Sequence, residues 1–371
     1  MARNRTLTLV VALFPIFAAI SMLFTNCAGQ GFSTIDSTAA DGGDPFIDMA
    51  WHLHNTGQIV YASKAGTAGA DMNLLGTWGQ SIYGSGVKIM ISDTGLEDTH
   101  EDLHDNFSYG GSKDYTLSYP YTANSSPPKA TDDNHGTSVA GLAAAVGWNG
   151  LGSRGVAPKA SLMAGNLISS QVTISSYGMI ADQLAGSFDI SNMSWGSTQN
   201  QVDDDGDGHN SNYEATMKSL LGTQRGGKGS IYVKAGGNDY IVECYGLTNV
   251  YCVGNSNFDR DNANPYQIIV AALDATGTSA DYSSPGANLW ISSFGGSYGD
   301  DSPAMMTTDR TGCTLGEAVS SASTTLEFEK GQLGNSNCNY TIAFNGTSSA
   351  SPTTAGAVAL MLEANPSLSW R

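Results

Sequence analysis

The chain has 371 residues, of which 13% are charged, and it carries a formal net charge of −18. This length allows one large domain with a substantial hydrophobic core. The negative charge, with no basic stretch, argues against nucleic acid as a partner.

The N-terminus has the pattern of an export signal. Arg3 and Arg5 precede an apolar run over residues 7–24, and a basic start followed by an apolar core is typical of a secretory signal. We predict a signal peptide over residues 1–26 and a tether or linker, rich in Ser, Thr, Gly and Asp, over residues 27–43.

Cys27 directly follows this apolar run and resembles the lipidated cysteine of a bacterial lipoprotein, although Asn26 replaces the small residue usual before it. We expect an exported protein, either a lipoprotein attached to the outer or cell membrane through Cys27 or a secreted form. An uncleaved anchor stays open as an alternative, because the apolar run is about long enough to span a bilayer.

Two polar motifs follow predicted core elements. A short apolar strand over Val87–Ile91 ends in Asp93-Thr94-Gly95, which places the Asp93 carboxylate at the strand's C-terminal edge, where open α/β sheets build their sites. Further along, His135 is followed by glycine and then by small residues at helical spacing. This pattern predicts a helix that carries an imidazole in its first turn.

An acidic segment over residues 203–214 fits the calcium-loop pattern D-x-D-x-D-G-x5-E. It would bind Ca²⁺ through side chains and one main-chain carbonyl, because this ion prefers hard oxygen ligands. A solvated acidic turn and a pocket for basic side chains stay open as alternatives. The predicted ligands are Asp203, Asp205, Asp207, the carbonyl of His209, and Glu214.

A buried strand run over Ile231–Lys234 leads into a glycine pair and Asn238. The glycines allow the backbone to approach a substrate closely. The side-chain amide of Asn238 could then donate to a developing oxyanion, together with the backbone N–H of Ser348. The alternative is an asparagine in an ordinary glycine-rich turn.

Ser348 lies in the segment Asn345-Gly346-Thr347-Ser348, just before a predicted helix over Pro352–Glu363. A serine at such a junction can be exposed, rigid and close to the positive end of the helix dipole. Serine alone is a poor nucleophile and needs a base and an orienting acid. His135 and Asp93 are the candidates for these roles.

The motifs around Asp93, His135 and Ser348 follow one another in the order Asp, His, Ser, which is the order of subtilisin among the unrelated catalytic triads. From about Asp44 to Arg371 the chain resembles the subtilisin-like serine proteases, and its details resemble the kexin/proprotein convertase branch. Those details include Asp44-Pro45-Phe46, Trp51-His52-Leu53 and Ser194-Trp195-Gly196. We expect a peptidase domain over residues 44–371, truncated where kexin-like enzymes usually continue.

Predicted strands and predicted helices alternate along the chain. This alternation predicts an α/β fold of three layers, with a mostly parallel sheet flanked by helices on both faces. The predicted strands are Val87–Ile91, Ser161–Leu167, Ile190–Ser194, Ile231–Lys234 and Gln267–Ala272, and the predicted helices are Thr137–Val146, Ser176–Leu184, Tyr213–Leu221 and Pro352–Glu363.

The resemblance implies two further sets of residues. Substrate would lie between two walls, formed by Ser194, Trp195 and Gly196 and by Ala235, Gly236 and Gly237. A structural calcium ion would bind to side chains of Asp44, Asp102 and Asn149 and to the carbonyls of Val146, Leu151 and Ser153.

Four cysteines besides Cys27 allow three pairings. We predict Cys244–Cys252 and Cys313–Cys338, because each pair closes a local loop without crossing the core. An oxidising compartment would make them structural disulfides.

The predicted function is that of a serine endopeptidase with peptide or protein substrates, stabilised by calcium and expected to be a monomer. Cleavage after basic residues is one expectation, since Asp239 and Glu243 lie near the oxyanion loop. The acidic residues that convertases carry just after Ser-Trp-Gly are absent at residues 197–200. The alternatives are a catalytically silent surface lipoprotein that acts as a calcium-dependent binding or adhesion module, and an esterase.

Overall fold

A computed structural model describes residues 43–169, 171–172, 177–202, 209–299 and 302–371. The predicted signal peptide, Cys27 and nearly all of the tether lie outside these residues, as do Asp203, Asp205 and Asp207. Within the described part, no helix is both long and apolar enough to span a bilayer.

The centre of the fold is an eight-stranded sheet in the order β10-β9-β6-β5-β1-β4-β2-β3. All neighbours pair in parallel except β2 and β3, which are antiparallel. The strands are β1 Lys88–Ser92, β2 Ser112–Lys113, β3 Thr122–Ala123, β4 Ser161–Gly165, β5 Ile190–Met193, β6 Ile231–Ala235, β9 Gln267–Leu273 and β10 Ile291–Phe294.

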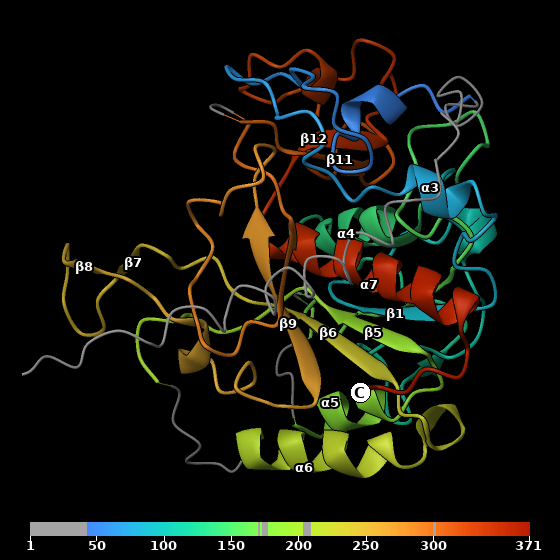
Figure 1. Cartoon of the computed structure of the whole chain (residues 1–371), viewed down its shortest axis with the longest axis vertical. Helices are drawn as coiled ribbons and strands as arrows, with labels where there is room; N and C mark the ends of the chain where they lie inside the picture. Colours follow the sequence, from blue (N-terminus) through green and yellow to red (C-terminus); the bar gives the residue numbers. More distant parts are fainter. Residues whose placement is uncertain (1–42, 170, 173–176, 203–208, 300–301) are drawn as a thin grey trace, which may run out of the picture. The chain divides into compact units, whose positions relative to one another are not determined.

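Helices cover both faces of this sheet (Figure 1). On one face lie α4 (His135–Ala144) and α7 (Thr347–Ala364), and on the other lie α5 (Tyr177–Leu184) and α6 (His209–Leu221). Successive residues of β1 point to opposite faces, as the pleat requires. Ile89 and Ile91 pack in the core that contains α4 and α7, whereas Met90 packs with residues of α5 and α6.

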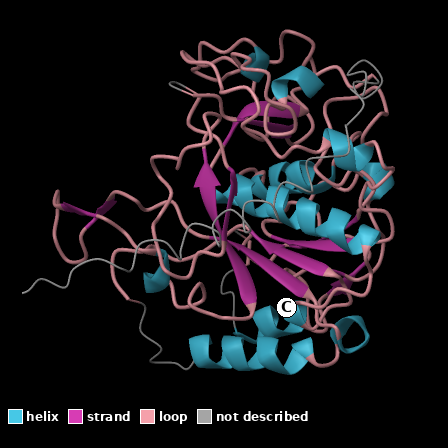
Figure 2. Cartoon of the chain, viewed as in Figure 1, coloured by secondary structure: helices cyan, strands magenta, loops and turns pink. Residues whose placement is uncertain are grey.

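The other elements are short and lie in the connections (Figure 2). Two antiparallel pairs lie outside the main sheet. They are β7 Val242–Glu243 with β8 Tyr251–Cys252, and β11 Met305–Thr308 with β12 Tyr340–Phe344. The short helices are η2 Ile47–Met49, α3 Leu75–Trp78, η3 His104–Asn106, η4 Gln224–Gly227, η5 Ser256–Phe258 and η6 Phe328–Lys330.

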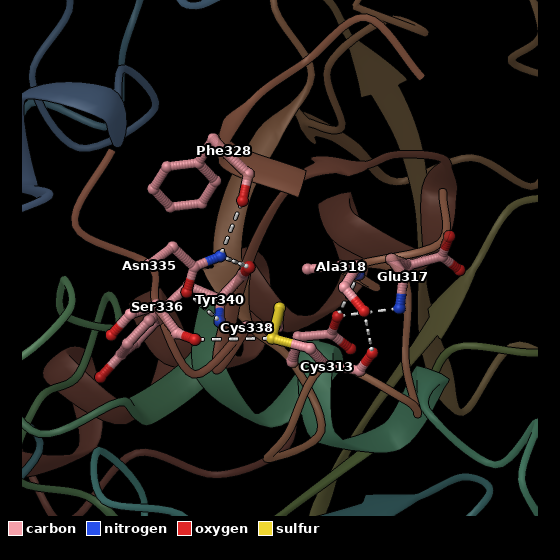
Figure 3. Close-up of a disulfide and its surroundings, with 10 residues drawn as sticks. Cys313, Glu317, Ala318, Phe328, Asn335, Ser336, Cys338 and Tyr340 are labelled. Carbon is pink, nitrogen blue, oxygen red and sulfur yellow. Dashed lines mark hydrogen bonds between the residues drawn. A yellow bond between two sulfur atoms is a disulfide. The ribbon is translucent and has the colours of Figure 1, made fainter. Parts of the chain in front are cut away.

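Both predicted disulfides form. Cys244–Cys252 closes the β7–β8 hairpin, and Cys313–Cys338 joins the loop after β11 to the segment before β12. Figure 3 shows the second bridge beside Asn335, whose amide donates to the carbonyls of Phe328 and Tyr340.

The predicted fold class is confirmed, and the five predicted strands and four predicted helices are present with small shifts of their ends. Helix α7 begins five residues before the predicted start, so Pro352 lies inside it. A glycine- and serine-rich stretch after residue 283 contains the edge strand β10, which pairs with β9 on one side only.

Candidate active site

Asp93 and His135 form a hydrogen-bonded pair at the end of β1. Asp93 follows the strand and is fully buried, and its Oδ1 lies 2.8 Å from Nδ1 of His135. The same oxygen accepts the backbone N–H of Thr94 at 2.8 Å. The carboxylate therefore fixes the ring of a histidine that starts helix α4 and keeps 30% of its side chain exposed.

The glycine after the histidine is required by the close approach of two segments. A Cβ atom at Gly136 would overlap the carbonyl oxygen of Gly95 and lie 3.1 Å from Cβ of Asp93. The N–H of Gly136 instead donates to Thr94 Oγ1 at 3.0 Å. The small residue thus lets α4 approach the end of β1 closely enough for the imidazole to reach the carboxylate.

The surroundings of His135 stabilise its protonated form. Burial lowers the pKa of His135, but the charge and hydrogen bond of Asp93, together with the charge of Glu317, raise it further than burial lowers it. The net shift is upward, so the ring is a stronger base than a free histidine.

Ser348 is the second residue of α7, directly after a turn at Gly346 with φ of +95°. Its hydroxyl donates to the carbonyl of Ser194 at 3.2 Å, and its own carbonyl accepts the hydroxyl of Ser194 at 3.0 Å. That carbonyl is free to do so because Pro352, four residues on, has no N–H to donate to it. The proline inside the helix therefore helps to join the serine to the segment after β5.

Among the hydrogen bonds of the described residues, none joins Ser348 to His135. The hydroxyl must leave the carbonyl of Ser194 before it can donate to the imidazole. In sites without substrate, catalytic hydrogen bonds are often long or unformed.

Asn238 lies against the start of α7. Its Oδ1 accepts the N–H of Thr347 at 2.8 Å and the hydroxyl of Thr347 at 2.9 Å. Because the N–H and the hydroxyl of Thr347 both donate to Oδ1, the nitrogen end of the Asn238 amide points away from the helix. This end is Nδ2, and a Cβ atom built on Gly346 would lie 3.1 Å from Nδ2 and 3.5 Å from the backbone nitrogen of Ser348. Two donors, Asn238 Nδ2 and the Ser348 N–H, thus lie beside the serine.

A pocket of about 190 Å³ opens beside Ser348 and Asn238. Five of the six residues predicted to form the substrate walls line it, namely Ser194, Trp195, Gly196, Ala235 and Gly237. Gly236 does not line it, because its backbone N–H and C=O are turned away to Val270 and Gln199.

One buried residue supports this pocket without lining it and is not predicted from the sequence. Gln199 is buried, and its side chain donates to the carbonyl of Gly236 at 2.9 Å, so it supports the loop that carries Asn238. Asp239 lines the pocket and accepts the N–H of Gln199 at 2.8 Å. A lone glutamine in a polar stretch gives no signal in a single sequence, whereas the position of Asp239 near the oxyanion loop is already expected from the sequence.

Residues 84–371 match the model of the Subtilase family. The chain belongs to this family. An extracellular serine protease of Aeromonas sobria is 35% identical over 343 residues, which are 89% of this chain and 53% of that protein. Neuroendocrine convertase 2 of Rattus norvegicus is 29% identical over 351 residues, which are 92% of this chain and 47% of that protein.

A solved structure of a family member has a similar fold. The crystal structure of the Aeromonas sobria serine protease in complex with a chaperone gives a TM-score of 0.80 at 32% identity, and covers 88% of this subtilase chain and 55% of that chain. This subtilase chain thus spans about half the length of the relatives that it matches.

The side chains of the first predicted calcium site all make hydrogen bonds within the protein. Both oxygens of Asp44 accept hydrogen bonds, from the backbone N–H groups of residues 148–150 and from Nε of Arg154 at 2.8 Å. Asn149 donates its amide to Asp102 Oδ1 at 2.8 Å and accepts the N–H of Leu151 through its own oxygen.

One carboxylate oxygen of this predicted calcium site accepts no hydrogen bond from the described residues. Asp102 Oδ2 is buried without a hydrogen-bond partner, and burial raises the pKa of Asp102 to about 8. The prediction also names the carbonyls of Val146, Leu151 and Ser153, and calcium takes six to eight oxygen ligands, backbone carbonyls and waters among them. Because Arg154 binds Asp44 and Asn149 donates to Asp102, these side chains would have to exchange partners before they held the ion, and this site stays a prediction. Throughout the described residues, no group of three or more His, Cys, Asp or Glu side chains could hold a metal ion.

The second predicted calcium loop is described only at its end. His209 begins helix α6 and Glu214 is exposed on that helix, whereas the three aspartates lie outside the described residues. This loop stays a prediction.

Proposed function

We propose that this subtilase is a serine endopeptidase with Ser348 as nucleophile, His135 as general base and Asp93 as the orienting acid. The observations that support this most directly are the 2.8 Å hydrogen bond between Asp93 and His135 and the position of Ser348 beside Asn238 in the pocket. Family membership agrees with the proposal, because the relatives named above are proteases.

In the first half of the reaction, Ser348 Oγ attacks the carbonyl carbon of the substrate while its proton passes to Nε2 of His135. Asp93 accepts the hydrogen bond from Nδ1–H, which sets the tautomer and stabilises the imidazolium. His135 then gives this proton to the leaving amine, and the C–N bond breaks. In the second half, water attacks the acyl-enzyme with His135 again as base and restores Ser348.

The oxyanion that forms in each half would receive hydrogen bonds from Asn238 Nδ2 and the backbone N–H of Ser348. The amide of Asn238 is already oriented by its two bonds to Thr347, so little reorganisation is needed as charge develops.

The test is hydrolysis of a peptide panel by the wild-type protein and by the Ser348→Ala variant. Ser118→Ala serves as control, since Ser118 is exposed. We expect cleavage that the Ser348 variant loses and the control keeps. If a folded wild-type protein cleaves no peptide, or if the Ser348 variant cleaves as well as the wild type, the proposal is wrong.

We propose further that the pocket favours a basic side chain before the cleaved bond, because the half-buried carboxylate of Asp239 lines it. In Asp239→Asn, kcat/KM for Arg and Lys peptides should fall about tenfold. This corresponds to the loss of roughly 1.4 kcal/mol of attraction between the carboxylate and the basic side chain at a partly exposed site. Peptides with Phe at the same position should change little. An equal loss for both kinds of peptide would remove Asp239 as the cause.

Calcium, export and lipidation are also proposals. We propose that Ca²⁺ binds the acidic loop at residues 203–214. Of its proposed side-chain ligands, Glu214 lies within the described residues. A calcium-dependent rise of Tm that is lost in Asp205→Asn would support it, and a Tm without calcium dependence would contradict it. Mass spectrometry of the mature N-terminus would show whether the mature chain begins at a lipidated Cys27.

A further inference from the structure

One lysine lies completely buried behind the substrate pocket. Lys234 is in strand β6, and none of its side chain is exposed. Lysine is almost never fully buried unless its ammonium is paired. The partners of this ammonium therefore indicate what the residue does.

The ammonium holds one wall of the pocket by two routes. Lys234 Nζ donates to the carbonyl of Trp195 at 2.6 Å, and it lies 3.5 Å from Oδ2 of Asp259. That carboxylate oxygen accepts the backbone N–H of Ser197 at 3.1 Å. The charged pair thus fixes the main chain on both sides of Gly196.

The space behind Gly196 is filled by this pair. A Cβ atom at Gly196 would lie 2.7 Å from Asp259 Oδ2 and 3.2 Å from Lys234 Nζ. On its front side, Gly196 lines the pocket together with its two neighbours. Nζ also lies 4.7 Å from the centre of the Trp195 ring, a distance at which a cation is attracted to an aromatic face.

We propose that Lys234 and Asp259 are positioning residues that hold the wall Trp195–Ser197 in place for the substrate. This inference rests on the proposed function in one respect, that the pocket receives the substrate. Neither residue lines the pocket, so both act through the wall. Because reacting groups displaced by about 1 Å can lose about 10²-fold in rate, loss of the charged pair that holds this wall should lower the rate through the position of the substrate.

The test compares Lys234→Met, Lys234→Arg and Asp259→Asn with Lys218→Met, which makes the same change on the exposed surface of α6. Because Lys234→Met leaves a buried carboxylate without its cation, the charge-balanced double variant Lys234→Met/Asp259→Asn is included in case the single variant does not fold.

Two substrates separate a positioning role from general damage. In Lys234→Met and in the double variant, kcat/KM for a peptide with a bulky residue before the cleaved bond should fall about 10- to 100-fold. Hydrolysis of p-nitrophenyl acetate, which is too small to need the wall, should change far less, and Lys234→Arg should recover most of the peptide activity. Equal losses on both substrates, or no loss on the peptide, would overturn the inference.

Hydrogen exchange at the Ser197 amide tests the same inference without any activity. The amide should lose protection in Lys234→Met, Asp259→Asn and the double variant but keep it in Lys218→Met, because its acceptor is the carboxylate that Lys234 holds. Unchanged protection in all variants would contradict the inference. A wild-type protein that cleaves neither substrate would contradict the proposed function, and exchange would still decide the role of Lys234.

Discussion

Two buried carboxylates in this subtilase each pair with one basic side chain at the same distance, but the two pairs can do different chemistry. Asp93 lies 2.8 Å from a ring nitrogen of His135, and Asp44 lies 2.8 Å from Nε of Arg154. Histidine gains and loses its proton near neutral pH, whereas arginine stays charged in proteins. The first pair can therefore take part in proton transfer, and the second can only compensate charge.

Exposure separates the two pairs further. The His135 side chain is 30% exposed, but that of Arg154 is only 1% exposed and lies over the ring of Trp148 at 4.4 Å. We infer that the Asp93 pair is built for chemistry and the Asp44 pair for stability. Loss of the Asp93 pair should therefore lower activity, and loss of the Asp44 pair should lower stability.

The largest effect should follow from His135→Ala. Without the base, kcat for a peptide should fall by about 10⁴-fold or more, as for the triads of serine proteases in general, while Tm changes little. Steady-state kinetics with His104→Ala as control makes the comparison, since His104 is exposed. A His135 variant that keeps more than a tenth of the activity would remove it from the proposed triad.

Arg154→Met should show the reverse pattern. Removal of one partner from a buried charged pair lowers the free energy of unfolding by about 3–5 kcal/mol, because the other charge stays buried without compensation. Denaturant unfolding measures the loss, and the activity of each folded molecule should stay near that of the wild type. If the wild type instead shows a calcium-dependent Tm that Asp44→Asn abolishes, Asp44 is a calcium ligand and our view of this pair is wrong.

Asn238→Ala should lower kcat by about 10²- to 10³-fold, the effect known for an oxyanion donor in subtilisin, a member of the same family. KM should change little, because the donor acts as charge develops rather than on the bound substrate. The matched control is Asn124→Ala, whose side chain is exposed. A change in KM alone would indicate that Asn238 only helps to shape the pocket.

The smallest effect concerns pH. Because the pKa of His135 is raised and the reaction needs the neutral ring, the acid limb of kcat/KM should lie above the usual histidine range. Glu317→Gln removes one of the charges that raise this pKa, so the limb should move to lower pH. Asp105→Asn, at an 82% exposed position, should leave the limb in place. A limb that moves upward in Glu317→Gln would contradict the electrostatic explanation.

The raised pKa also sets the sign of a stability effect. His135 binds its proton more tightly in the folded chain, so it adds stability below its unfolded pKa, and this contribution is lost as the pH rises through the folded value.

The parts of the site that the sequence predicts are those that local rules determine. Asp93 follows a short apolar strand, and His135 precedes a glycine that the close approach of Gly95 requires. Strand–helix alternation likewise predicts the sheet and its two layers of helices. Each of these signals lies within a few neighbouring residues.

The parts that the sequence does not predict depend on contacts between distant residues. Arg154 pairs with a carboxylate 110 residues away, and nothing beside it indicates that partner. Lys234 lies inside an apolar strand run, where its charge looks like an exception until Trp195 and Asp259 are seen around it. The orientation of the Ser348 hydroxyl also depends on a distant residue, Ser194.

In the proposed mechanism Ser348 becomes a nucleophile through His135, although its hydroxyl donates a hydrogen bond to the carbonyl of Ser194 in this structure. The most direct test is labelling with a fluorophosphonate, followed by peptide mapping of the modified residue. We expect one label per chain, on Ser348, and none in His135→Ala. A folded wild-type protein that takes up no label, or a His135→Ala variant that is labelled equally fast, would contradict this mechanism.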